Sequence, residues 1–137
     1  MPVIAVIEAP SILGLRPSGV DTLPGALLRA GLLERLDARH AGRVEPCMPY
    51  DPRRDEETGL LNVTAIAAFS RALADAVGDV VRRGEFPLVL GGDCSILLGC
   101  LLALRRLGRY GLLFLDGHAD FCQPDANPNG EVASMAL

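Results

Sequence analysis

The spacing of apolar residues alternates along the chain between the pattern of a strand and that of a helix. It predicts strands that alternate with helices. The expected strands are the stretches 3–7, 43–48, 86–90 and 111–115, of which the second holds Pro46 and is expected at a sheet edge. An uninterrupted apolar run of this kind is typical of a strand buried on both faces. Strands that are joined through helices predict a parallel sheet between two helical layers, which is a three-layer α/β/α domain.

Three helices are expected between these strands. They cover the stretches 24–37, 63–83 and 96–107. Pro24 suits the first turn of the first helix, whose leucines recur at every fourth position. Asn62 can cap the second helix, and a glycine follows both the second and the third as a stop signal. The third helix is apolar nearly all round, so we expect it to be buried against the sheet.

The composition indicates a soluble globular domain. Of the 137 residues, 50% are hydrophobic, and the net charge is −4 without a cluster of basic residues, so a nucleic-acid surface is not expected. The four cysteines form no Cys-x-x-Cys pair and are expected to be reduced thiols. The N-terminus lacks the pattern of a signal peptide, and no apolar stretch reaches membrane-spanning length without interruption. We therefore expect a cytoplasmic protein that acts without a membrane or nucleic-acid partner.

Three side chains that can bind a metal follow the last expected strand at alternate positions. Asp116, His118 and Asp120 come directly after the apolar run 112–115. If the extended conformation continues, all three lie on one face at the carboxyl end of the sheet, where α/β domains place their ligands. Two carboxylates and an imidazole can hold a divalent cation. The alternative is a polar exit from the strand, in which the aspartates only bond backbone amides.

A second turn that holds a candidate functional residue follows the third expected strand. It is the stretch 91–95 (Gly-Gly-Asp-Cys-Ser). Its glycines permit close approach of the backbone, and Cys94 lies near a helix N-terminus that would favour its thiolate. Three interpretations of Cys94 stay open at this point. It is a metal ligand that joins the aspartates and the histidine, a nucleophile at a strand–turn–helix elbow, or a small buried residue without chemistry.

Three segments of the chain match the motifs of one enzyme family. The stretch 91–94 is similar to a Gly-Gly-Asp-His motif, and the stretch 116–120 (Asp-Gly-His-Ala-Asp) is similar to Asp-Ala-His-x-Asp. The stretch 19–32 resembles Gly-Pro-x-x-Leu-Arg-x-x-Gly-Leu. In these motifs, and from the first expected strand to the end of the chain, the sequence resembles the arginase–agmatinase–formimidoylglutamase ureohydrolases. The resemblance implies an arginase-like α/β fold.

The resemblance also implies a mechanism and a set of ligands. Members of the family hold two Mn²⁺ ions that activate a bridging hydroxide for attack on a guanidinium or amidine carbon. By resemblance, Asp116 would bridge both metals, His118 would bind one of them and Asp120 the other. Cys94 takes the place of a histidine ligand on the same metal as Asp120. A small guanidinium or amidine substrate and a homo-oligomeric assembly are implied in the same way.

The chain departs from the family pattern at several positions. A thiolate at Cys94 is softer than imidazole and shifts the metal preference from Mn²⁺ towards Zn²⁺ or Fe²⁺. Ala133 stands where the arginase branch has a histidine that acts in proton transfer, which leaves specificity for arginine open. Glu131 lies where arginases contact the α-amino end of the substrate, and Cys122 is either a pocket residue or a buried loop cysteine.

Two further expectations rest on comparison with the family pattern. The family contributes more ligands from a Ser-x-Asp-x-Asp motif beyond residue 137, and it places later strands between the third and fourth strands expected here. We therefore expect residues 1–137 to be the N-terminal portion of a single, incomplete arginase-like domain. Asp93 and Ser95 are expected to hold the turn rather than to react.

Three functions are compatible with these observations. The first is a ureohydrolase-type hydrolase of a linear C–N bond, which uses Asp116, His118 and Asp120 through bound metal. The second is a non-catalytic relative that keeps the fold for a structural or regulatory role, which the changes at Cys94 and Ala133 favour. The third is a cysteine hydrolase that uses Cys94 as its nucleophile.

Overall fold

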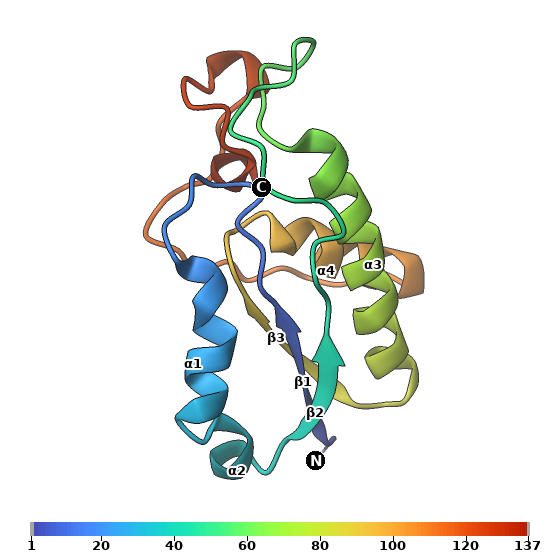
Figure 1. Cartoon of the computed structure of the whole chain (residues 1–137). Coiled ribbons are helices and arrows are strands. Elements are labelled where there is room, and N and C mark those ends of the chain that lie inside the picture. Colours follow the sequence, from blue (N-terminus) through green and yellow to red (C-terminus); the bar gives the residue numbers. More distant parts are fainter. Residues whose placement is uncertain (1, 137) are drawn as a thin grey trace.

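The structure is a computed structural model that describes residues 2–136. The strands of this part of the chain are β1 (Ile4–Ala9), β2 (Arg39–Arg43) and β3 (Phe86–Gly91). The helices are α1 (Leu23–Arg29), α2 (Leu32–Leu36), α3 (Val63–Arg82) and α4 (Ile96–Leu107), which Figure 1 shows around the sheet. Three short 3-10 helices are also present, namely η1 (Val20–Thr22), η2 (Pro124–Ala126) and η3 (Val132–Met135).

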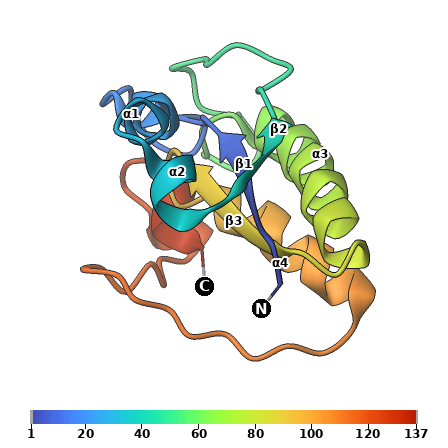
Figure 2. The same ribbon diagram turned by 90° about the horizontal axis from the view of Figure 1, so that it is seen from below.

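The strand β1 is the centre of a parallel sheet with the order β2-β1-β3. It is buried along almost its whole length because α1 and α2 lie on one side of the sheet and α3 and α4 on the other (Figure 2). The parallel direction brings the turns that follow β1 and β3 to the same edge. The predicted α/β architecture, with helices on both sides of a parallel sheet, is therefore confirmed.

The hydrophobic core lies between β1 and α3. Phe69, Leu73 and Val77 recur at helical spacing on α3, are almost fully buried and belong to one cluster with Ile7 of β1. Burial of each such side chain stabilises the fold by roughly 1.5–3 kcal/mol. The apolar stripe that predicts this helix is therefore the face that packs on the sheet.

The helix α4 packs against α3 rather than directly on the sheet. The two helices approach closely at Gly99, where an added Cβ would lie 3.0 Å from Cβ of Leu73. Of the residues of α4, Gly99 and Ala103 are buried, whereas its leucines are partly exposed. The expectation of a helix buried all round against the sheet is therefore wrong, because α4 packs on one side only, where Ile96, Cys100 and Leu102 are partly buried against the core cluster.

The second strand and the first helix also differ from the prediction. Pairing with β1 places β2 at Arg39–Arg43 instead of 43–48, and its edge position is confirmed. An edge strand is half exposed, so no apolar run marks it in the sequence. The helix expected at 24–37 is two helices, because Gly31 takes a left-handed conformation with φ of 82°.

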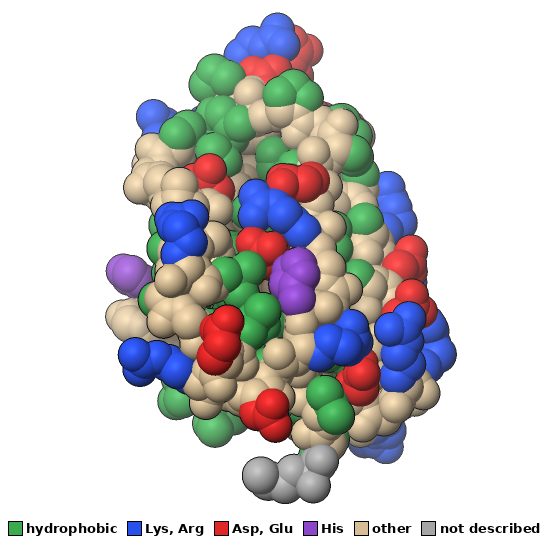
Figure 3. Space-filling model, turned by 60° about the horizontal axis from the view of Figure 1, so that its bottom comes forward, with side chains coloured by type: hydrophobic (Ala, Val, Ile, Leu, Met, Phe, Trp, Pro, Cys, Tyr) green, Lys and Arg blue, Asp and Glu red, His purple; other side chains and the backbone are tan. Residues whose placement is uncertain are grey.

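Charged side chains connect the two neighbouring strands β1 and β2. Buried Glu8 lies 3.0 Å from Nε2 of His40 and accepts a hydrogen bond of 2.8 Å from Arg43. His40 and Arg43 both belong to β2, so these contacts tie the edge strand to β1. Acidic and basic side chains are interspersed on the face of the molecule seen in Figure 3.

The stretch 111–115 is not a strand, so the sheet has three strands where about four were predicted. Most of its side chains are exposed to solvent, with Leu113 83% and Leu115 86% exposed. Within residues 2–136, no neighbouring strand offers this stretch a ladder of hydrogen bonds, and an apolar run without a partner cannot form a sheet. Among the helices of these residues, none has both the length and the apolar character needed to cross a membrane.

Candidate active site

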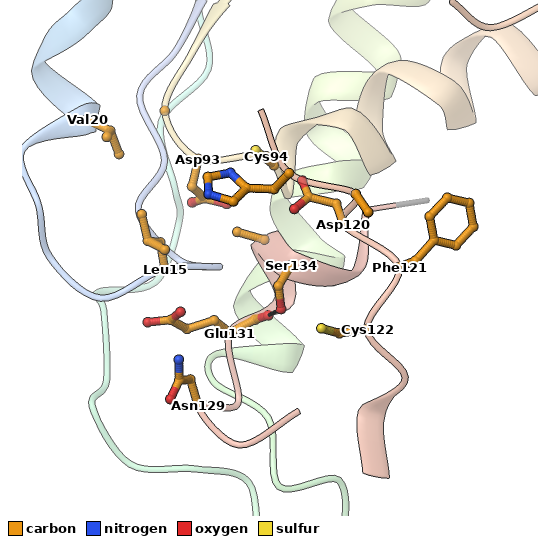
Figure 4. Close-up of a pocket in the computed structure, with 14 residues that line it drawn as sticks. Leu15, Val20, Asp93, Cys94, Asp120, Phe121, Cys122, Asn129, Glu131 and Ser134 are labelled. Atoms are coloured by element: carbon orange, nitrogen blue, oxygen red, sulfur yellow. Dashed lines mark hydrogen bonds between the residues drawn. The ribbon is translucent and has the colours of Figure 1, made fainter. Parts of the chain in front are cut away.

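Three of the predicted metal ligands meet beyond the carboxyl end of β3. Cys94 lies in the turn between β3 and α4, and Asp116 and Asp120 come from the loop that follows α4. One ligand atom from each of the three lies within 4.8 Å of the others. Sγ of Cys94 is 3.8 Å from Oδ2 of Asp116, and Figure 4 shows Cys94 beside Asp120. A soft thiol and two carboxylates thus form one cluster.

Asp120 has the features of a ligand whose carboxylate is not fully paired among residues 2–136. Its backbone adopts a left-handed φ of 49°, which is uncommon for a residue other than glycine. Its Oδ2 atom is buried, and no hydrogen bond reaches it from residues 2–136. Buried carboxylate oxygens are normally paired, and a cation would supply the missing partner. The donor set therefore fits a divalent metal ion.

His118 is the predicted ligand that the cluster leaves out. Its side chain is 88% exposed, with Nδ1 3.5 Å from Oδ1 of Asp116. The expected alternation fails because residues 117 and 118 form a bend, so the backbone is not extended through this stretch. The His118 N–H donates a hydrogen bond of 2.8 Å to Oδ1 of Asp116. This bond is the main reason that the pKa of Asp116 is lowered.

The turn 91–95 is held by the carboxylate of Asp93, which is 4% exposed. Oδ1 accepts a hydrogen bond of 2.8 Å from the Ser95 N–H, and Oδ2 accepts one of 3.1 Å from the Gly14 N–H. The chain also passes very close to the loop after β1, since a Cβ on Gly92 would lie 2.0 Å from the Ser11 carbonyl oxygen. Asp93 therefore holds the turn, as the sequence predicts, and glycine is required beside it.

A pocket of about 750 Å³ adjoins the cluster. Cys94, His118 and Asp120 line it together with Glu131 and Cys122, the two residues proposed from the sequence as substrate contacts. Cys122 is exposed, so its interpretation as a buried loop cysteine is wrong. The remaining lining residues are Leu15, Val20, Gly92, Asp93, Ala119, Phe121, Asn129, Ala133 and Ser134.

Part of this lining could not be identified from the sequence. Leu15 and Val20 follow β1, whereas Asn129 and Ser134 belong to the last part of the chain. The Ala133 N–H donates a hydrogen bond of 2.9 Å to the Gly14 carbonyl oxygen and joins these distant segments. The carboxyl ends of parallel strands are expected to lie at the same edge of the sheet. The pairing of β1 with β3 determines which loops cover that edge.

The sequence pattern of the Arginase family matches residues 4–137. This chain belongs to the Arginase family. It is 36% identical over 140 residues to the arginase of Bacillus caldovelox, with 98% of this chain and 47% of that protein covered. The arginase of Bacillus subtilis is 34% identical, with 98% and 46% covered. The chain thus spans about half the length of the curated relatives it matches.

Solved arginase structures share the fold. The arginase from Bacillus caldovelox superposes with a TM-score of 0.90 at 36% identity, covering 100% of this chain and 48% of that chain. The arginase from Bacillus cereus gives a TM-score of 0.85 at 32% identity, with 100% and 46% covered. The resemblance seen in the sequence motifs is therefore confirmed, and the relatives carry the name of a hydrolase that acts on C–N bonds.

The sequence predicts that the helix N-terminus favours the thiolate of Cys94, but the surroundings of Cys94 in this arginase-family site favour the protonated thiol. Burial and the negative charges of Asp120, Asp116 and Asp93 raise the pKa of the Cys94 thiol to about 11. The neighbouring carboxylates and burial therefore outweigh the favourable field of the α4 N-terminus. In the protein without a cation, the thiol keeps its proton at neutral pH and is a poor nucleophile.

Proposed function

We propose that this chain forms the Cys94–Asp116–Asp120 part of the active site in a metal-dependent ureohydrolase. The reaction is hydrolysis of a linear C–N bond in a guanidinium or amidine compound, with release of urea or a related amide. The observation that carries the proposal is the cluster of Cys94, Asp116 and Asp120, in which one buried carboxylate oxygen has no partner among the described residues. The arginase names of the relatives favour arginine as the substrate.

The residues of the cluster would hold the metal. When bound, Mn²⁺ supplies a hydroxide at neutral pH by lowering the pKa of a water molecule. The carboxylates of Asp116 and Asp120 neutralise the charge of such a cation, and Cys94 favours the softer Zn²⁺ or Fe²⁺. His118, next to Asp116 and on the pocket wall, is a further candidate ligand.

The pocket wall would position the substrate. Glu131 offers a carboxylate to a cationic group, and Cys122 contributes to the lining. Ala133 cannot transfer protons, so His118 is the histidine of the pocket that is able to accept one. Cytoplasmic location, organisation as one domain and assembly into a homo-oligomer stay predictions.

The proposal is tested by calorimetric titration of the reduced chain with Mn²⁺ and Zn²⁺. We expect Asp120→Asn and Asp116→Asn to weaken binding by tenfold or more, because each removes a charged ligand. Cys94→His should favour Mn²⁺ over Zn²⁺ relative to the unchanged chain. Asp125→Asn, an exposed change outside the cluster, should leave binding unaffected. Absence of binding, or equal binding by all these variants, contradicts the proposal.

Hydrolysis is then measured as release of urea or ammonia from arginine, agmatine, guanidinobutyrate and formimidoylglutamate. Tight metal binding without turnover of any of these compounds would support the second candidate function, a non-catalytic member of the family. The observation that favours this alternative is the pair of changes at Cys94 and Ala133. A cysteine hydrolase is disfavoured by the raised pKa of Cys94, and an activity that is abolished by EDTA would exclude it.

A further inference from the structure

A second cavity, a groove of about 430 Å³, lies between α3 and α4 and shares no residue with the metal cluster. On its α3 side, the lining recurs at every third or fourth position and consists of Val63, Ile66, Ala67, Ser70 and Arg71. Leu98 and Leu102 of α4 line the opposite side. Small-molecule sites occupy about 300–1,000 Å³, so the groove is large enough for a small ligand.

The walls of the groove are mostly apolar and only partly covered. Leu98 is 36% exposed, and Val63 and Leu102 are partly buried. Between Val63 and Arg71, α3 advances by about 12 Å, at about 1.5 Å per residue. An elongated apolar surface of this kind gains free energy when an alkyl chain displaces water from it.

The floor of the groove holds a hydroxyl group without a partner. Ser70 is 7% exposed, and its Oγ atom is buried without a hydrogen bond to any group of residues 2–136. In a helix, a serine hydroxyl can bond the carbonyl of the residue four positions earlier, but Ser70 makes no such bond. Buried hydroxyl groups are normally paired, so a ligand that carries an acceptor would supply the missing partner.

The charge of the lining comes from Arg71, which follows Ser70 directly. Asp75, one turn further along α3, is paired with Arg106 at 2.7 Å. Within the described part of the chain, Arg71 itself takes part in no ion pair, and no acidic residue lines the groove. Because a guanidinium group binds a carboxylate through two parallel N–H donors, this end of the groove favours an anion.

We propose that the groove between α3 and α4 binds a medium-chain monocarboxylate, such as octanoate. Its alkyl chain lies between Ile66 and the leucines of α4, and its carboxylate pairs with Arg71. Rotation about the Cα–Cβ bond of Ser70 lets the hydroxyl donate a hydrogen bond to the same carboxylate. This is a ligand site in addition to the proposed active site and does not depend on it.

Calorimetric titration of the metal-free chain with octanoate tests the proposal. We expect saturable binding at one site, and hexanoate should bind about tenfold more weakly, because each buried CH₂ group strengthens binding about fourfold. Octylammonium has the same alkyl chain with the opposite charge and should bind more weakly than octanoate.

Variants of exposed residues locate the site. Ala67→Phe fills the groove and should weaken octanoate binding by tenfold or more, whereas Ala72→Phe, an exposed change of α3 outside the groove, is the matched control. Arg71→Ala should weaken binding about threefold to fivefold, as expected for an exposed ion pair, with Arg105→Ala as its control. Ser70→Ala should weaken binding without lowering the Tm of the free chain, because it removes an unpaired buried hydroxyl.

Several results would overturn the proposal. These are the absence of saturable octanoate binding, equal binding by Ala67→Phe and Ala72→Phe, and equal affinities for octanoate and octylammonium. Sedimentation velocity tests a second copy of the chain as the occupant. A dimer that Ala67→Phe dissociates and octanoate leaves intact would make the groove an interface between copies and overturn the proposal.

Failure of the groove proposal leaves the proposed function standing, because metal binding by Cys94, Asp116 and Asp120 is measured separately. Thermal unfolding establishes that each variant is folded. If Ala67→Phe fails to fold, the comparison of Arg71→Ala with Arg105→Ala still decides, since both are surface changes and equal affinities would overturn the proposal.

Discussion

Replacement of Asp93 by alanine should loosen the turn that presents Cys94. The Asp93 carboxylate is buried and accepts hydrogen bonds from two backbone N–H groups, those of Ser95 and Gly14. A hydrogen bond to a charged group contributes about 1.5–3 kcal/mol, and the variant also leaves two N–H groups without their acceptor. Removal of the charge relieves repulsion from Asp116 and Asp120, but across solvent this amounts to roughly 1 kcal/mol or less. We therefore expect a net loss of about 3 kcal/mol, since the hydrogen bonds outweigh the repulsion.

Thermal and urea unfolding measure this loss. With an unfolding entropy of about 2.1 cal/mol/K per residue, 3 kcal/mol lowers Tm by about 10 °C in a chain of 137 residues. Asp93→Asn keeps one acceptor oxygen and should lose about half as much. The control is Asp75→Ala on exposed α3 surface, where loss of the ion pair with Arg106 should cost less than about 1 kcal/mol. A free energy of unfolding for Asp93→Ala equal to that of the control would refute the reasoning.

Three further predictions follow from single contacts. Gly92→Ala should abolish the folded state or shift the turn, because the added Cβ would lie only 2.0 Å from the Ser11 carbonyl oxygen. Gly117→Ala should be tolerated, because no atom lies within 4 Å of the added Cβ. Circular dichroism and metal titration compare the two variants. Burial raises the pKa of the Cys100 thiol from 9.0 to about 11, so the folded state binds this proton more tightly than the unfolded chain. Stability should therefore fall as pH rises from about 9 to about 11, and Cys100→Ala should remove that part of the slope in urea unfolding. Leu113→Asn should reduce binding of a hydrophobic dye without lowering Tm, because this side chain is 83% exposed.

Each of these three has a clear contrary result. Equal folding and metal binding by the two glycine variants would contradict the close approach of the turn to the loop after β1. An alkaline slope of equal size in Cys100→Ala and the unchanged chain would contradict the role of Cys100, since Cys94, whose pKa is also raised to about 11, accounts for only the remaining part. A lower Tm for Leu113→Asn would mean that the stretch 111–115 is packed in solution.

The periodicity of the sequence was sufficient to predict those elements whose signal lies within their own residues. The apolar run of β1, the stripe of α3 and the glycine stops are local signals, and the corresponding elements lie close to the predicted positions. The chemistry of Cys94, Asp116 and Asp120 was equally visible, because a motif keeps its ligand types together in sequence. These signals identified an arginase-like α/β protein and three members of its candidate metal cluster.

Long-range pairing and backbone conformation determined the remaining features. The edge strand β2 is set by its ladder with β1, and the apolar run at 111–115 stays unpaired because no described strand lies beside it. The bend at residues 117 and 118 leaves His118 beside Asp116 but outside the three-residue cluster, although its spacing suggested a common face with the aspartates. The pocket lining combines the loop after β1 with the last part of the chain, which the hydrogen bond from Ala133 to Gly14 joins across more than a hundred residues. Contacts of this kind depend on the free energy of the whole fold, which no local pattern of hydrophobic and polar residues encodes.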